Sequence, residues 1–428
     1  MLIEHIHVRN FKSIKEATLN LEPLTVIVGA NAAGKSNIIN VFRFISNIIT
    51  VGIDNAIALQ GGIPYLTNAC LKKGTPIEIS FTVNLSSEGW VRHSDIKHIG
   101  FEIERIHYHF IIQPNLRGNG YHIYRDTLQF DLKCMKVNAS AKKEDRYTDM
   151  SESLTFLFDR KTPESSVKVS FSFSDNSSFD NDTKEKIKQD TSAFFFCKLA
   201  NENKKELMLY RMALLLPPFF SEDSLIRIFD FDPRVLKASS SMVSIRRLNE
   251  DGSNLALVLR GILNTKEKRK KLTTLLNEFL PFVESITVEN NLDKSVSYKL
   301  QEKYSNKSFH ANFLSDGTVS VLAIIIALYF EAESNVIILE EPERNIHPKL
   351  LPDFLASAED VSTEKQVIIT THNPELLKHS SISNVRLVTR DKTGFSIVSS
   401  PKDSETVQRF IKNDLGLDDL FIQDLLGD

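Results

Sequence analysis

The sequence predicts an α/β fold with a mixed central sheet, an antiparallel β flank and an inserted helical lid or subdomain. Three observations indicate this fold class. The motif GANAAGKS at residues 29–36 lies between an apolar run and a helix-like pattern. A second apolar run, Val336 to Leu339, ends in two carboxylates, and several segments within residues 76–132 alternate between apolar and polar side chains. Continuous apolar runs are typical of buried parallel strands, whereas alternation is typical of half-buried antiparallel strands.

The N-terminal part is expected to contain short strands up to Val28 and then a helix that ends near Ile49. The run Leu24 to Val28 fits a buried strand, and apolar residues then recur at helical spacing at Ile38, Ile39, Phe42, Ile45 and Ile49. Residues 29–36 therefore have the strand–loop–helix context that a Walker A loop requires. A chance match in a surface loop is the alternative, and it would not explain this context.

Each residue type in this loop has a chemical reason. Glycines let backbone N–H groups curl around phosphate oxygens, and the N-terminus of the following helix adds partial positive charge. Lys35 is expected to reach the terminal phosphates, and the Ser36 hydroxyl is expected to ligate Mg²⁺. The loop is thus predicted to bind ATP with Mg²⁺. The residues expected at the nucleotide here are Gly29, Asn31, Gly34, Lys35, Ser36 and Asn37.

Two adjacent acids, Glu340 and Glu341, follow the second apolar run. Mg²⁺ prefers oxygen ligands, and hydrolysis needs a group that orients or deprotonates water. We therefore assign Glu340 to the metal together with Ser36, and Glu341 to the attacking water. Solvated acids at a strand end are the structural alternative.

A third apolar strand, residues 366–371, ends at His372. It follows the paired carboxylates by about one strand–helix–strand step, so His372 is expected to emerge at the same sheet edge as the phosphate loop. A contact with the γ-phosphate or the attacking water is its expected role. A histidine after a strand can also be purely structural.

The segments between these motifs predict antiparallel strands and a helical insertion, and with them a division of the chain into three parts. Residues 76–85 place Ile77, Ile79, Phe81 and Val83 on one strand face, and residues 103–112 and 120–132 are expected to add antiparallel strands. Residues 184–216 are mostly helical in pattern, with an aromatic cluster at 194–196 that is expected to be core because large exposed apolar patches are rare. The predicted division is an N-terminal lobe at 1–182, a helical insertion at 183–228 and a C-terminal lobe at 229–428.

The segment LSDGT at residues 314–318 precedes an apolar helical pattern at 319–330. A Ser-x-Gly turn at a helix N-terminus can bind phosphate. Many helices also begin with Ser, Asp and Gly simply as capping residues.

Together these motifs carry a family resemblance. GANAAGKS, LSDGT, VIILEEPERNIHP and TTHNPELL, with VRNFKSI at residues 8–14, resemble the RecF/SMC/OLD-like branch of the ABC ATPases. More narrowly, the chain is similar to the stand-alone AAA_21-type ATPases of bacterial anti-phage systems of the Septu or PARIS kind. The resemblance implies an ABC-type ATPase head, ATP hydrolysis to ADP and phosphate, and sites completed by a second subunit.

The resemblance also implies roles for particular residues. Ser315 and Gly317 would contact the γ-phosphate of a second subunit's ATP, and residues 343–347 would form the loop that crosses that interface. Lys12 and Ser13 would lie beside the nucleotide. The signature is LSDGT rather than LSGGQ, and Glu-Glu replaces the commoner Asp-Glu. The glutamine of the Q-loop stays open among Gln60, Gln113 and Gln129.

Composition indicates which partners and which cellular compartment to expect for the protein. The net charge of −3 gives no global basic field for nucleic acid. The cysteines Cys70, Cys134 and Cys197 are odd in number and widely spaced, which favours a reducing, cytoplasmic location over a disulfide framework. No uninterrupted apolar run is long enough to span a bilayer, so no membrane association is expected.

One basic run, Lys266 to Lys271, is either the solvated face of a helix or a nucleic-acid contact. The leading hypothesis is an ATP-driven switch that forms a homodimer or higher homo-oligomer and controls a separately encoded effector, a nuclease, in anti-phage defence. The alternative is a RecF-like, ATP-dependent DNA-binding repair protein.

Overall fold

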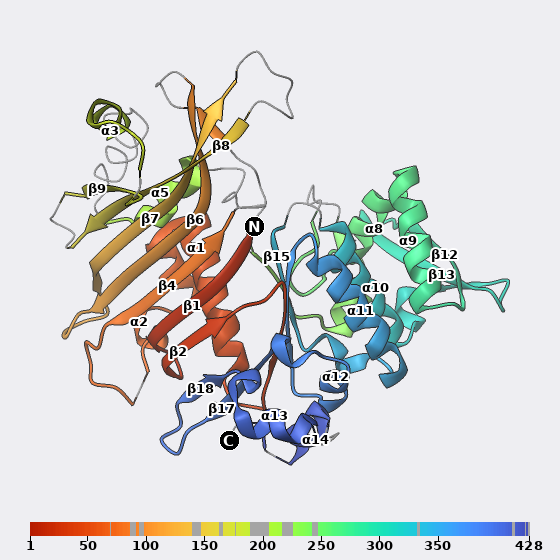
Figure 1. Cartoon of the computed structure of the whole chain (residues 1–428). Helices are drawn as coiled ribbons and strands as arrows, with labels where there is room; N and C mark the ends of the chain where they lie inside the picture. The colour runs from red at the N-terminus through yellow and green to blue at the C-terminus, as the bar shows by residue number, and fades with distance from the viewer. Residues whose placement is uncertain are drawn as a thin grey trace. The chain divides into compact units, whose positions relative to one another are not determined.

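The structure is a computed structural model, drawn in Figure 1. It describes residues 1–68, 70–85, 91–93, 98–138, 147–161, 166–175, 177–188, 205–215, 226–241, 247–331, 334–412, 416–423 and 425–426. The chain divides into two compact units, within each of which most contacts between residues are made. Unit 1 comprises Met1–Leu21, Asn37–Leu225 and Arg390–Val398, and unit 2 comprises Glu22–Ser36, Ile226–Thr389 and Ser399–Asp428. The three-part division made from the sequence stays a prediction.

Unit 2 contains a parallel sheet whose strands are buried on both faces. Its order is β10 (Ile226–Phe229), β15 (Val336–Glu340), β16 (Gln366–Thr371), β3 (Leu24–Val28) and β17 (Val385–Arg390). Every residue of β3 and β16 is buried, as expected for strands covered by helices on both sides. The helices α10 (Asp316–Phe330) and α11 (Leu351–Ser362) contribute buried faces to the same core.

A smaller antiparallel sheet also belongs to unit 2, and none of its strands was expected from the sequence. It consists of β11 (Ser240–Ser241), β13 (Ser295–Glu302) and β12 (Val283–Asn290), with β14 (Ser308–His310) paired to β13. Helices α8 (Leu255–Leu263) and α9 (Lys266–Phe279) lie against it (Figure 1). The predicted helix at the basic run is therefore confirmed as α9.

Unit 1 is built on the antiparallel flank. Its strands follow the order β18 (Ser396–Ser399), β2 (Ile14–Asn20), β1 (Leu2–Phe11), β4 (Ile77–Asn84), β6 (Ile99–Pro114), β7 (Tyr121–Val137), β8 (Tyr147–Arg160) and β9 (Lys168–Phe173), with β5 (Val91–His93) on β6. The predicted buried face of residues 77–83 is confirmed, because Ile77, Ile79, Phe81 and Val83 are each at most 3% exposed.

The helix that follows the Walker A loop, α1 (Lys35–Leu59), is longer than the predicted end near Ile49. It bends at Gly52, whose φ of 78° lies in the left-handed region. By length and composition α1 could cross a membrane, yet 56% of its apolar window is buried inside the protein, as in a core helix.

Of the predicted insertion at 183–228, residues 189–204 and 216–225, which include the aromatic cluster, lie outside the described residues. The described parts of the insertion contain α3 (Asn181–Lys188) and α5 (Met208–Leu215). Elsewhere the described residues also form the helices α2 (Ile63–Leu66), α7 (Pro233–Leu236), α12 (Pro374–Lys378), α13 (Glu405–Lys412) and α14 (Leu417–Ile422). They also form the short 3-10 turns η2 (Ala311–Phe313), η3 (Pro342–Asn345), η4 (Pro348–Leu350), η5 (Ile382–Asn384) and η6 (Pro401–Asp403).

Candidate functional site

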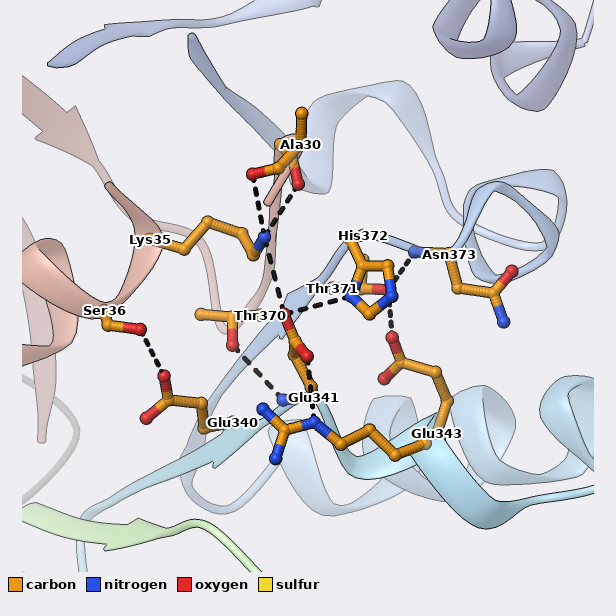
Figure 2. A network of polar contacts seen from close by, with 12 residues as sticks. Ala30, Lys35, Ser36, Glu340, Glu341, Glu343, Thr370, Thr371, His372 and Asn373 are labelled. Atoms are coloured by element: carbon orange, nitrogen blue, oxygen red, sulfur yellow. Dashed lines mark hydrogen bonds and ion pairs between the residues drawn. The ribbon is translucent and has the colours of Figure 1, made fainter. Parts of the chain in front are cut away.

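Strand register brings the sequence motifs of unit 2 to one edge of the parallel sheet. In the β3–β16 pairing Val28 lies opposite Thr371, and in the β15–β16 pairing Glu340 lies opposite Thr370. The chain therefore leaves all three strands at neighbouring points, toward the phosphate loop, Glu341 and His372. Figure 2 shows these side chains converging. The expectation that His372 emerges at the edge of the phosphate loop is confirmed.

The phosphate loop is held by its own lysine. Lys35, at the start of α1, is 6% exposed, and its Nζ donates to the carbonyl oxygens of Gly29 at 2.7 Å and Ala30 at 3.2 Å (Figure 2). Gly34 has a φ of 116°, which permits the turn into the helix. A side chain at Gly29 would clash with the Val388 carbonyl. The exposed Asn31 lies in the turn of this loop.

Ser36 and Glu340 form the second contact of the site. The Ser36 hydroxyl donates to Oε1 of Glu340 at 2.6 Å. A hydroxyl and a carboxylate, adjacent to a phosphate loop, are the oxygen donors that suit Mg²⁺, which keeps waters and phosphate oxygens as its other ligands. Within the part of the chain that the structure describes there is no cluster of three or more His, Cys, Asp or Glu that could hold a metal by itself. Ser36 and Glu340 thus fit a magnesium that arrives with the nucleotide.

Glu341 lies among three basic side chains. Its Oε1 is 3.0 Å from Nδ1 of His372 and 3.5 Å from Nζ of Lys35, and its Oε2 accepts from Nε of Arg344 at 2.9 Å (Figure 2). Burial favours the neutral acid, but hydrogen bonds from Arg344 and His372 outweigh it and lower the pKa of Glu341. The carboxylate is therefore held ionised.

The backbone of Glu341 is strained. Its φ of 43° and ψ of 53° are left-handed, a conformation that costs a residue with a side chain about 1–3 kcal/mol. In this conformation its side chain reaches Lys35 of the phosphate loop, 3.5 Å away.

The contacts of Arg344, Glu343 and Thr371, which lie near the paired carboxylates, were not predicted. Arg344 also reaches Oδ1 of Asp230 at 3.2 Å, so it bridges two acids. Glu343 is 5% exposed, accepts a hydrogen bond from the Thr371 hydroxyl, and its burial raises its pKa. Its Oε2 is buried without a partner among the described residues. The sequence held no signal for these contacts beyond nearness to the carboxylates.

The signature segment forms a cap. Ser315 is the N-cap of α10 and accepts from the backbone N–H of Thr318 at 3.1 Å, while Asp316 pairs with Lys237 at 2.5 Å. A Cβ on Gly317 would lie 2.7 Å from the carbonyl oxygen of Asn345. The signature turn therefore packs closely against the 343–347 loop of its own chain, and Ser315 and Asp316 stay exposed.

Lys12, Ser13 and Asn37 belong to unit 1, and there they lie close together. The Ser13 hydroxyl accepts from Nδ2 of Asn37 at 2.6 Å, and Nζ of Lys12 donates to Oε1 of Gln60 at 2.7 Å. Burial, and then the nearby Arg43, lower the pKa of Lys12. Of the three Q-loop candidates, Gln60 is the one that contacts a predicted site residue, since Gln113 bonds to the Gly74 carbonyl and Gln129 to Asp131.

With this geometry in place, the chain can be compared with known proteins. The family model AAA_15, an AAA ATPase domain, matches residues 1–377. No curated protein sequence matches significantly. An SMC head bound to the C-winged helix domain of ScpA is similar in structure, with 12% identity, a TM-score of 0.50, and coverage of 93% of this chain and 98% of that chain.

Two other SMC head structures are less similar. The SMC head domain from Thermotoga maritima is 13% identical over 94% of this chain and 99% of that chain, with a TM-score of 0.42. The head with an extended coiled coil bound to the C-terminal domain of ScpA from Pyrococcus furiosus is 12% identical over 96% and 99%, with a TM-score of 0.49. The first likeness confirms the predicted ABC-type head fold and its mixed sheet. The matching family is AAA_15, whereas the narrower prediction was the AAA_21 group.

Proposed function

The chain belongs to the AAA_15 family of AAA ATPase domains, and we propose that it hydrolyses ATP at the site of Figure 2 and uses the cycle as a switch. The observation that carries this proposal is the meeting of Lys35, Glu341 and His372 at one sheet edge. A phosphate-binding cation, an ionised carboxylate and an imidazole at hydrogen-bonding distance are the parts that water attack on a phosphoryl group requires.

Each residue has a role in that reaction. Lys35 and the backbone of the loop bind the phosphates, and Glu341 orients the attacking water and accepts its proton. His372 holds the Glu341 carboxylate, and in this proposal it also contacts the γ-phosphate. Ser36 and Glu340 would hold Mg²⁺, which when bound neutralises charge on the phosphate oxygens.

The switch works through pairs of subunits. Ser315 and Gly317 of one copy complete the ATP site of a second copy, so that ATP favours a homodimer or a larger homo-oligomer and hydrolysis releases it. The exposure of Ser315 and Asp316 supports this assignment, because side chains that contact a second copy must be accessible in the single chain. The close packing of Gly317 on the 343–347 loop links the two interface segments.

The motif resemblance supports a biological setting. We assign the switch to anti-phage defence in the cytoplasm, where it controls a separately encoded effector, a nuclease. This setting follows from the resemblance of the motifs to those of the defence ATPases. Cys70 and Cys134 are both free thiols, in keeping with a reducing compartment.

A RecF-like DNA-binding function is the second candidate, and one observation favours it. The basic run of α9 is exposed, as a surface for phosphate contacts would be. This function requires ATP-dependent binding of duplex DNA with a steep salt dependence.

Phosphate release and molar mass by light scattering test the proposal together. Glu341→Gln should lower turnover about 10²–10⁴-fold and give a larger species with ATP and Mg²⁺, and adding Ser315→Arg should abolish that species. Lys35→Ala should abolish ATP binding and turnover. Equal turnover of wild type and Glu341→Gln would remove the catalytic role of Glu341. A mass that never responds to ATP would remove the pairing mechanism.

A further inference from the structure

A groove of about 430 Å³ lies in unit 2 between α9 and β12. On the strand side it is lined by six consecutive residues, 283–288. Successive side chains of a strand point to opposite faces. Consecutive residues can therefore line one hollow only where the hollow follows the edge of the strand. Figure 1 shows α9 and β12 side by side, in agreement with their contacts.

This edge of β12 is open. Among the described strands β12 pairs only with β13, so its other side presents backbone N–H and C=O groups without a ladder partner. Proteins usually protect such edges with charges, prolines or bulges. The one irregularity of β12 lies at its start, between Val283 and Ser285, and the regular stretch 285–288 carries neither charge nor proline. The edge is thus suited to accept another strand.

The opposite wall is one stripe of a helix. The residues of α9 that line the groove recur at spacings of three and four, which places them on one face of the helix. Leu272 and Leu276 form its buried, apolar part, and the end of α8 adds Leu263. The residues that line this wall are Arg260, Leu263, Asn264, Arg269, Leu272, Thr273, Leu276 and Asn277.

Positive charge surrounds the groove. Among the described residues that line it, Glu284 is the only acid, against two arginines. Arg269 uses Nε to donate to the Leu263 carbonyl at 2.8 Å, which leaves its charge without a carboxylate partner. In the part of the chain that the structure describes, no carboxylate lies within 4.0 Å of any of Arg260, Lys266, Lys268, Arg269 and Lys270. An acidic ligand would meet a surplus of cations here.

We propose that this groove binds an extended, acidic segment of a partner protein, which adds to β12 as a further strand. Backbone hydrogen bonds to a sheet edge give affinity, while pockets for alternate side chains give specificity. Alternate apolar side chains of the segment would pack on Leu263 and Val288, the half-buried apolar residues of the lining, and its carboxylates would pair with Arg260 and the basic run of α9. Nucleic acid would use the cations but would leave the strand edge and the apolar wall without a role. The proposal does not depend on ATP hydrolysis.

A displayed library of random linear peptides, panned on the full-length protein without nucleotide, tests this proposal. The selected peptides should alternate apolar and acidic residues. As synthetic peptides, they should slow hydrogen exchange of the amides of residues 285–288. They should bind about tenfold more weakly to the double variant Lys266→Glu/Lys270→Glu. These lysines are exposed, so the variant should stay folded, which its melting curve checks. Lys392→Glu, an exposed charge reversal in unit 1, is the matched control.

Other results would overturn the proposal. These are the absence of selected peptides, selected peptides that leave the exchange of β12 unchanged, or binding that the double variant does not weaken. A duplex DNA oligonucleotide serves as the second probe. If it binds with a steep salt dependence that the double variant removes, and no peptide is selected, the groove face is a nucleic-acid surface instead.

Discussion

Nζ of Lys35 lies 3.5 Å from Oε1 of Glu341, so the cation that should bind phosphate is paired with the carboxylate that should activate water. The two groups are 6% and 12% exposed, and little solvent separates them. An incoming phosphate must take over the Lys35 ammonium from Glu341. The same two residues therefore influence affinity for ATP as well as turnover.

We expect Glu341→Gln to bind ATP more tightly than wild type, because the neutral amide no longer competes for Lys35. An exposed ion pair is worth up to about 1 kcal/mol, and this one is largely buried, so we expect the dissociation constant to fall by roughly fivefold or more. Isothermal titration with a non-hydrolysable ATP analogue measures it. Glu375→Gln is the matched control, since Glu375 contacts Lys378 and His379 rather than Lys35. Weaker binding by Glu341→Gln would contradict competition for Lys35.

Ser36→Ala should raise the Mg²⁺ concentration needed for half-maximal turnover. The substitution removes the hydroxyl that lies 2.6 Å from Glu340 and would ligate the ion. We expect a shift of about tenfold or more, as for the loss of other groups that support a metal site. Ser46→Ala, in the same helix, is the control. If both variants show the same Mg²⁺ curve as wild type, Ser36 does not bind the metal.

Much of this site follows from the sequence because parallel strands align their carboxyl ends. Once residues 24–28, 336–340 and 366–371 are recognised as buried strands, Lys35, Glu341 and His372 must emerge near one another. A residue that directly follows one of these strands in the sequence must then lie at this edge of the sheet. The site's main residues could therefore be predicted without a structure, although their roles stay predictions.

Contacts that depend on a turn or on distant pairing could not be predicted. Arg344 reaches both Glu341 and Asp230 because η3 (Pro342–Asn345) turns it back toward two strand ends, a geometry that no periodic pattern encodes. The small sheet around β12 was not predicted, although Val296, Tyr298 and Leu300 of β13 alternate with polar residues as in a half-buried strand. Pairing between antiparallel strands far apart in sequence is equally hidden, as Asp126 and Arg160 illustrate.

The buried pair of Asp126 and Arg160 should be essential to the stability of unit 1. Nη2 of Arg160 donates to Asp126 at 2.5 Å and to the Glu206 carbonyl, and Asp126 also accepts from the Met208 N–H at the start of α5. Asp126→Asn would leave a buried cation without its counter-ion, at a cost of about 3–5 kcal/mol. Hydrogen exchange of β7 and β8 amides measures this cost locally.

The double substitution Asp126→Leu/Arg160→Met distinguishes a charge effect from loss of packing. It should destabilise β7 and β8 less than Asp126→Asn does, because it leaves no buried charge. Asp182→Asn, which breaks the exposed pair with Lys186, should leave exchange unchanged. If the single and double variants exchange equally fast, the ionic pairing is not what stabilises this region.

Gly317 offers a test of the link between the signature turn and the 343–347 loop. A Cβ at this position would lie 2.7 Å from the Asn345 carbonyl, so Gly317→Ala should push the two segments apart and destabilise unit 2 by about 1–3 kcal/mol. Gly261→Ala is the matched control, because its Cβ would meet nothing within 4 Å and helix α8 should gain about 0.5–1 kcal/mol. Urea midpoints measure both effects.

Because Gly317 also belongs to the proposed subunit interface, the ATP-dependent mass of Gly317→Ala should fall in the Glu341→Gln background. A stable Gly317→Ala protein that still assembles with ATP would show that the close approach to Asn345 matters neither for folding nor for pairing.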